Sequence, residues 1–195
     1  MLSPKELELV NNADWILTKN IIIDKVYQLF GQLSERYLTA IQQNGLLAKE
    51  DLGIRTPKIS KGEQYEGLPW VMLDYPRNFT GDDAFGIRSF FWWGNCCSIT
   101  LQLAGRFQQK YAPVLEKYFA DPIKSKEWFI STATDPWQHH FRNENYAPVT
   151  ESNKGAMSAL PFIKLAKKIP LDDWNSIDIF FEKNYAEILQ ILTGG

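Results

Sequence analysis

Residues 84–103 constrain the fold of this chain more than any other segment. The runs AFGIRSFFWWG and CCSITLQL consist of β-forming residues that meet at Gly94-Asn95, which predicts two antiparallel strands joined by a tight turn. Successive side chains of a strand point to opposite faces, so the length of the turn decides which residues share a face. A three-residue turn that pairs Trp93 with Cys97 separates polar from apolar residues, whereas a two-residue turn mixes them. We therefore expect an odd-length turn or an equivalent bulge.

This register predicts one apolar face and one polar face of the sheet. The apolar face, on which Ser89 is the only polar member, would comprise Phe85, Ile87, Phe91, Trp93, Cys97, Ile99, Leu101 and Leu103. The other face would comprise Arg88, Phe90, Trp92, Ser98, Thr100 and Gln102. We expect helices to cover the apolar face, because that face must be buried against another element.

Helices are predicted near both ends of the chain. Ser3-Pro4-Lys5-Glu6 has the pattern of a capped helix start. An apolar stripe at helical spacing then runs from Trp15 to Ile41 and ends near Gly45. A second stripe from Phe107 to Phe119 predicts a helix that Pro113 kinks or splits. The last helix would be capped by Asp172 or Asp173 and end at Gly194.

Further strands are predicted between these helices. WVMLDY (70–75) reads as a strand ended by Pro76, and EWFIST (127–132) as another. FIKLAKKI (162–169) fits both a strand and a helix. Pro161 and Pro170 enclose a length that is typical of strands, which favours the strand. Residues 46–69 read as a connector, and 133–156 as a long irregular loop of the kind that is often functional or mobile. Together these elements predict a single α+β domain over residues 1–195, with a mainly antiparallel sheet and helices packed on one face.

Composition and charge exclude several classes of function. The 195 residues carry a formal net charge of −2, and no concentrated basic face is visible, which argues against nucleic-acid binding. No run approaches the roughly 20 apolar residues of a membrane span, and the N-terminus lacks the pattern of a signal peptide. The two adjacent cysteines are not a disulfide framework. We expect a cytoplasmic protein.

The polar sheet face is the leading candidate for a functional site. In the neighbouring strand, placing Val71, Leu73 and Tyr75 inside puts Trp70 and Asp74 on the polar face, with Asp74 beside Arg88. The residues that we expect to bind a ligand are Trp70, Asp74, Arg77, Arg88, Trp92, Thr100 and Gln102. Aromatic walls with a few convergent polar groups suit a small polar or anionic ligand, or a partner protein. The alternative is an ordinary ion pair on a solvated sheet face.

Polar and charged residues in the segments that flank this strand could extend the site. They are Lys58, Lys61, Glu63, Tyr65, Glu66 and Arg77. Lysine and arginine near Arg88 could hold a carboxylate or a phosphate. The alternative is that these residues are solvated loop charges. The dispersed glycines do not form a phosphate-binding loop.

The chemistry-bearing residues do not identify a catalytic site or a cofactor. His139 and His140 are adjacent, so they would seldom ligate one metal ion together, and no metal site is predicted. Cys96 and Cys97 lack a nucleophile signature and are more typical of small apolar fillers. We therefore expect a non-catalytic binding protein without a cofactor. The alternative is an enzyme, such as a hydrolase, that uses His139 or His140 from the 133–156 loop.

The aromatic content raises the question of oligomeric state. The chain holds 12 Phe, 8 Tyr and 7 Trp, and Phe90, Trp92, Trp137 and Phe141 could form an exposed patch that marks a homodimer interface. The rival expectation is that the 133–156 loop folds over the sheet and buries these aromatic residues within one chain. The long loop favours this second expectation, and with it a monomer over a homodimer.

One block of the chain resembles a known group of proteins. The segments YEGLPWVMLDYPR, FGIRSFFWWGN and SITLQLAG resemble an uncharacterised family of bacterial hypothetical proteins, most specifically between Gly62 and Gly105. The resemblance implies a single cytoplasmic domain. Because that family has no assigned activity, it implies no functional residues.

Overall fold

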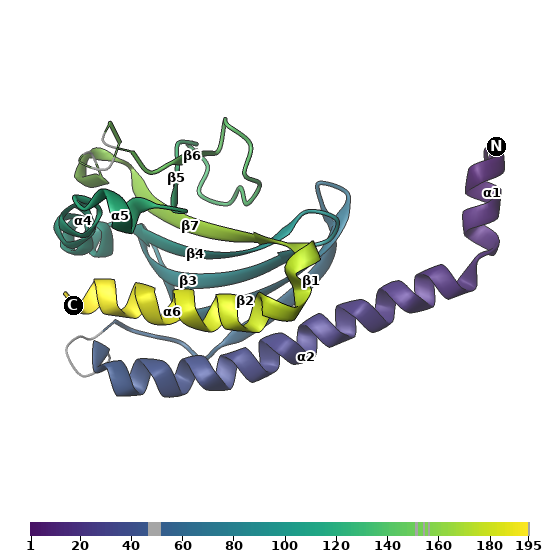
Figure 1. The fold of residues 1–195 in the computed structure, drawn as a ribbon, viewed down its shortest axis with the longest axis horizontal. Coiled ribbons are helices and arrows are strands. Elements are labelled where there is room, and N and C mark those ends of the chain that lie inside the picture. The colour runs from purple at the N-terminus through teal and green to yellow at the C-terminus, as the bar shows by residue number, and fades with distance from the viewer. Residues whose placement is uncertain (47–51, 151, 154, 156, 195) are drawn as a thin grey trace.

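The chain forms a seven-stranded antiparallel sheet with helices on one face (Figure 1). The structure, a computed structural model, describes residues 1–46, 52–150, 152–153, 155 and 157–194. The strand order is β1-β2-β3-β4-β7-β5-β6. Helices α2 and α6 run across one face, and α4 lies beside them at one end of the sheet (Figure 1). The predicted α+β class, with N-terminal and C-terminal helices, is confirmed.

The elements follow one another along the chain as helices, then strands, then a mixture of both. In order they are α1 (Pro4–Asn11), α2 (Ala13–Asn44), β1 (Lys58–Tyr65), β2 (Leu68–Thr80), β3 (Asp83–Trp92), β4 (Cys96–Ala104), α4 (Arg106–Phe119), α5 (Pro122–Ser125), β5 (Phe129–Ser131), β6 (Tyr146–Pro148), η1 (Met157–Ala159), β7 (Phe162–Pro170), η2 (Leu171–Ser176) and α6 (Ile177–Thr193).

The helix ends follow the local sequence signals closely. Ser3 and Glu6 form a reciprocal capping box at the start of α1. Gly45 and Gly194 end α2 and α6 in the left-handed conformation that glycine adopts without steric cost. The prediction that Asp172 or Asp173 caps the last α-helix is wrong, because that turn is the 3₁₀ helix η2 and α6 begins at Ile177. Helix α4 is not split: it continues through Pro113.

The hairpin of β3 and β4 has the predicted faces but a different pairing. Trp92 pairs with Cys96 and Phe91 with Cys97, so the expected pairing of Trp93 with Cys97 is wrong. Residues 93–95 form the turn, in which Gly94 has φ +69°. The turn is odd in length, as expected, and the register differs by two positions. Because side chains alternate with a period of two, the same residues still face the helices.

Two segments before this hairpin are more extended than the sequence suggested. Strand β1 forms within the predicted connector, and β2 continues to Thr80 although the prediction ended it at Pro76. The register with β3 shifts between Asp74 and Arg77, so Pro76 lies in a bulge, where a residue without an N–H group is tolerated.

The later strands agree with expectation in part. Residues 162–170 form strand β7, as favoured. The 127–132 strand is shortened to Phe129–Ser131, and the expected loop over 133–156 contains strand β6. Residues 47–51 of the predicted connector, and residues 151, 154 and 156 of the predicted loop, lie outside the described residues.

The main hydrophobic core lies between the helices and the apolar sheet face. Phe30, Phe181 and Phe91 are among its buried members. The rings of Tyr37 and Tyr185 stack in parallel with centroids 3.6 Å apart. Ser89, a polar residue on this face, lies 2.9 Å from the Tyr37 hydroxyl, which satisfies its hydrogen bonding. Among the described residues, no helix is long and apolar enough to cross a membrane.

Candidate functional site

The sheet face opposite the helices is covered by a segment of the chain itself. Residues 132–145, here named the covering segment, connect β5 to β6 and lie over the sheet on the side away from α2 and α6 (Figure 1). Residues of this face, among them Phe90, Trp92 and Thr100, are consequently buried. The expectation that this loop buries Phe90 and Trp92 within one chain is therefore met, whereas Trp137 stays half exposed.

An ion pair lies at the centre of the covered face. Asp74 and Arg88 occupy directly paired positions of β2 and β3. The Arg88 guanidinium donates to both carboxylate oxygens of Asp74, at 2.7 Å and 3.2 Å. Both side chains are almost fully buried. A bidentate pair of this kind is stronger and better oriented than a surface ion pair.

His139 brings the covering segment into contact with this ion pair. Its Nε2 lies 3.3 Å from a terminal nitrogen of Arg88. Because a guanidinium can only donate, Nε2 is the acceptor. Burial lowers the pKa of His139 well below its ordinary value, and the charges of Lys164 and Arg88 lower it further. The imidazole is therefore neutral at physiological pH, as an acceptor must be.

Lys164 adds a second buried cation to the covered face. It lies on β7 opposite Gln102, and its ammonium group donates to the main-chain oxygen of Gln138 in the covering segment. Burial, and then the charge of Arg88, lower the pKa of Lys164 to about 7, while Asp135 opposes this shift weakly. Arg88 and Lys164 thus share the face with one buried carboxylate, Asp74.

The covering segment is held to the sheet mainly through the turn between β1 and β2. The hydroxyl of Tyr65 accepts hydrogen bonds from the backbone N–H groups of His139 and His140, at 2.6 Å and 3.1 Å. Arg142 forms an ion pair with Glu66. Glu66 and Gly67 both have positive φ values, which is the conformation of a tight hairpin turn. That turn places Tyr65 and Glu66 beneath the covering segment.

A groove opens between the edge of the covering segment and the sheet. It has a volume of about 350 Å³ and an aromatic wall. The residues that line it are Gly62, Glu63, Gln64, Tyr65, Trp70, Met72, Phe90, Trp137 and His139. A side chain at Gly62 would reach within 2.7 Å of the Trp70 indole, so glycine at this position lets Trp70 pack against β1.

Arg88 lies behind the wall of this groove. The Trp137 ring stands 5.4 Å from the Arg88 guanidinium and so screens it from solvent. His139 lines the groove and also contacts Arg88. The groove therefore leads to the buried ion pair through two side chains of the covering segment.

Two buried nitrogens near this face lack a partner. Among the described residues, Nε1 of Trp92 and Nδ1 of His140 are fully buried and make no hydrogen bond. Buried polar atoms are normally satisfied, so an unpaired N–H group such as that of Trp92 needs an explanation. Trp92 packs against Tyr65, with ring centroids 5.1 Å apart, which places its indole beside the groove.

By register, all of the predicted binding residues lie on this side of the sheet. Trp70, Asp74, Arg88, Trp92, Thr100 and Gln102 belong to its covered part. Arg77, beyond the β2 bulge, pairs with Gly86 on the same side, and its Nε donates to the Thr56 carbonyl at 2.9 Å. Of the predicted flanking charges, Lys61 pairs with Asp24 of α2 and Glu63 with Lys19. These residues therefore brace β1 against α2.

Sequence reasoning missed Lys164 on the covered face. Lys164 could have been found, because in the strand interpretation of 162–169 it alternates with the apolar residues Ile163 and Leu165 and must face the other way. Tyr65 was expected only as a flanking loop residue, because the strand that positions it was taken for a connector.

The histidines and cysteines show no assembled chemistry. Among the residues that the structure describes, no group of three or more His, Cys, Asp or Glu side chains is placed to hold a metal ion. Burial raises the pKa of Cys96 to about 11 and raises that of Cys97 further. Both thiols therefore stay protonated at neutral pH, which disfavours a nucleophilic role.

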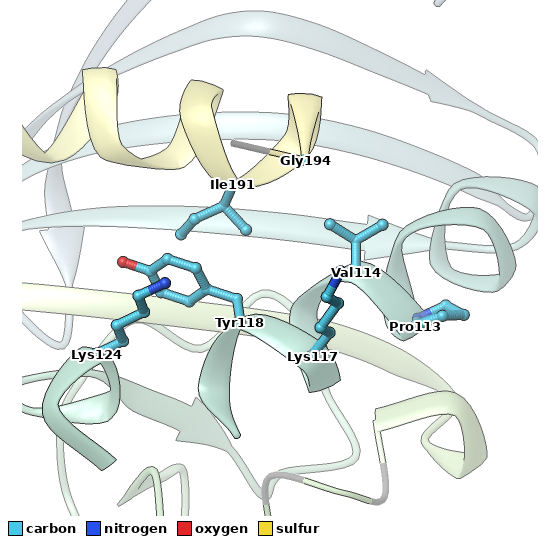
Figure 2. Close-up of a pocket in the computed structure, with 7 residues that line it drawn as sticks. All are labelled: Pro113, Val114, Lys117, Tyr118, Lys124, Ile191 and Gly194. Carbon is cyan, nitrogen blue, oxygen red and sulfur yellow. The ribbon is translucent and has the colours of Figure 1, made fainter. Parts of the chain in front are cut away.

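A second cavity lies at the far end of the helical layer. It has a volume of about 550 Å³ between α4, α5 and the end of α6. Figure 2 shows Val114, Lys117 and Tyr118 of α4 facing Ile191 of α6 across it. Its polar groups are engaged: Lys124 stands over the Tyr118 ring, and the Tyr118 hydroxyl donates to Glu187. This cavity lacks the convergent buried charges of the covered sheet face.

Comparisons of the chain with protein-family models, with curated proteins and with solved structures gave no match. The resemblance to an uncharacterised bacterial family stays a prediction, and the function is argued from the geometry alone.

Proposed function

We propose that this protein is a non-catalytic binding protein that takes a small anionic ligand in the groove beside the covered sheet face. The observation that carries this proposal is the excess of buried positive charge behind the groove. Arg88 and Lys164 are both buried, and in the described part of the chain Asp74 is the one carboxylate buried with them. Buried charges are costly unless they are paired. A carboxylate or phosphate group at this position would supply the missing negative charge.

The walls of the groove suit the rest of such a ligand. Tyr65, Trp70 and Phe90 provide an aromatic surface, which favours a flat or apolar body. The unpaired indole N–H of Trp92 offers a donor beside it. We infer that the charged end of the ligand approaches Arg88 when Trp137, which is half exposed, moves off the guanidinium.

A hydrolase that uses His139 or His140 lacks comparable support. Nε2 of His139 is already the acceptor of a hydrogen bond from Arg88, so its lone pair is not free to take a proton from a substrate. His140 is held by backbone hydrogen bonds to Tyr65 and Asn145. Catalysis, like the cytoplasmic location, stays a prediction from the sequence.

The proposal predicts that small anions quench the tryptophan fluorescence of the purified protein. The probes are inorganic phosphate and a panel of mono- and dicarboxylates, including aromatic ones. We expect saturable quenching by at least one probe, because Trp70 and Trp137 line the groove. The variant R88M/D74M replaces the buried ion pair with two apolar side chains, a kind of replacement that a fold often tolerates. We expect it to weaken binding at least about tenfold, a change of about 1.4 kcal/mol.

A matched control separates binding from general electrostatics. The variant R36M/E182M removes one ion pair and the same charges from the helical layer, where Arg36 and Glu182 are exposed. It should bind the probes as the wild-type protein does. The proposal is wrong if no anion in the panel binds, or if R88M/D74M folds and binds with unchanged affinity.

A further inference from the structure

The N-terminal arm of the molecule carries most of its exposed apolar surface. The arm, defined here as residues 1–27, comprises α1 and the first half of α2, and it projects beyond the sheet (Figure 1). Of the fourteen exposed large apolar side chains among the described residues, ten belong to it: Met1, Leu2, Leu7, Leu9, Val10, Trp15, Ile16, Leu17, Ile21 and Tyr27. A monomer rarely leaves so contiguous an apolar surface in water.

The apolar residues of the arm surround the helix. Ile23 and Val26 are buried against the body of the molecule. Leu17 and Ile21 point the other way and are 56% and 55% exposed. Exposed apolar side chains therefore also stand on the side away from the sheet, and a cluster of this kind marks an interaction surface.

The outward face of the arm is complementary to itself in an antiparallel arrangement. Asp14, Leu17, Thr18, Ile21 and Lys25 follow one another at helical spacing and so share this face. Asp14 lies at one end of this face and Lys25 at the other end, with Leu17 and Ile21 between them. Two copies related by a twofold axis near Lys19 and Asn20 would place Asp14 opposite Lys25 of the partner subunit at both ends. Neither Asp14 nor Lys25 forms an ion pair within the described residues.

We propose that two copies of this chain form a twofold-symmetric dimer through antiparallel packing of their N-terminal arms. Leu17 and Ile21 of each copy form the centre of the contact, and the two Asp14–Lys25 pairs fix its register. The antiparallel arrangement also carries the tip of each arm, with α1, along α2 of the partner subunit.

Light scattering with size-exclusion chromatography tests the association of the full chain. We expect twice the protomer mass of 22.5 kDa over a hundredfold dilution series. L17E and I21E should each raise the dimer dissociation constant by at least about tenfold, because each variant buries charge at the centre of the contact. I123E is the control, because Ile123 is 83% exposed and lies on α5. It should leave the mass unchanged.

Charge reversal tests the register and the identity of the partner. D14K puts two lysines opposite each other, and K25D puts two aspartates opposite each other, so each single variant should weaken the dimer. The double variant D14K/K25D restores both pairs and should restore the dimer. Circular dichroism shows whether each variant is folded. A monomeric wild-type protein overturns the proposal, and so does a dimer that persists in folded L17E and I21E. Failure of the double variant to recover overturns the antiparallel register.

Discussion

The covered sheet face brings together a small number of charged residues whose titration is altered by burial. Arg88 is neutralised by Asp74, whereas Lys164 has a main-chain oxygen as its hydrogen-bond partner. A carbonyl oxygen compensates a buried ammonium group only partly, so the pKa of Lys164 falls to about 7. Lys164 is consequently the residue at which stability, protonation and ligand binding are most directly coupled.

We predict that Lys164 makes the stability of the protein depend on pH above neutrality. Its pKa is about 7 in the folded chain and about 10.4 when unfolded. Between these values the unfolded chain binds the additional proton, so the free energy of unfolding rises with pH. The slope is at most about 1.4 kcal/mol per pH unit. Below pH 7 this contribution is constant, and the lowered pKa of His139 adds a further rise below pH 6.5.

Urea unfolding at several pH values measures this effect. K164M should remove the rise between pH 7 and pH 8, below the range in which Cys96 and Cys97 ionise in the unfolded chain, and should be more stable than the wild-type protein at neutral pH. K168M is the control, because Lys168 lies on the same face of β7 and is exposed. Equal slopes for K164M and the wild-type protein would contradict the assignment.

At the scale of elements, the turn between β1 and β2 determines how the covering segment is held. Tyr65 is the last residue of β1, and its hydroxyl is the shared acceptor for two backbone donors. The sheet under the covering segment is held separately, by long rows of backbone hydrogen bonds between β2, β3, β4 and β7. The covering segment and the sheet should therefore open separately.

We predict that Y65F releases the covering segment without unfolding the sheet. Without the hydroxyl, the N–H groups of His139 and His140 lose their acceptor, at a cost of about 1–3 kcal/mol for each group left unsatisfied. Amide hydrogen exchange should become faster at residues 139 and 140, while the amides of Phe91 and Ile99 stay protected. Y27F serves as the control, because Tyr27 is exposed on α2. Unchanged exchange at residues 139 and 140 would contradict this role of Tyr65.

At the scale of the whole molecule, one continuous core joins the N-terminal and C-terminal halves of the chain. It includes residues from α2, from the central strands and from α6. We therefore predict that residues 1–195 unfold as a single domain in one cooperative transition. The unfolding enthalpy should be on the order of 130 kcal/mol near 60 °C, at about 0.7 kcal/mol per residue.

Calorimetry and tryptophan fluorescence should report this transition at the same temperature. If the arms form a dimer, the midpoint should also rise with protein concentration, because association stabilises the folded state by mass action. Two resolved calorimetric transitions would show instead that the chain contains more than one unit.

Local signals in the sequence determined the helix ends and the faces of the central hairpin. Ser3, Gly45 and Gly194 act through their own backbones and nearest neighbours, so they can be recognised without the rest of the fold. The alternation of Phe85, Ile87 and Phe91 with Arg88 and Phe90 likewise has only one arrangement that separates polar from apolar residues. For this reason the faces were predicted correctly even though the exact pairs were not.

The tertiary structure alone decided which buried charges meet and what covers them. Lys164, Tyr65 and His139 come from segments that are far apart in the sequence, and each is polar or aromatic in a segment without a recognisable motif. Their contact depends on β7 pairing with β4 and on the covering segment crossing the sheet. Sequence periodicity describes how one element orients its own side chains, but not which distant element is packed against them. The candidate site is built from contacts between elements that are distant in the sequence, and sequence periodicity does not specify such contacts.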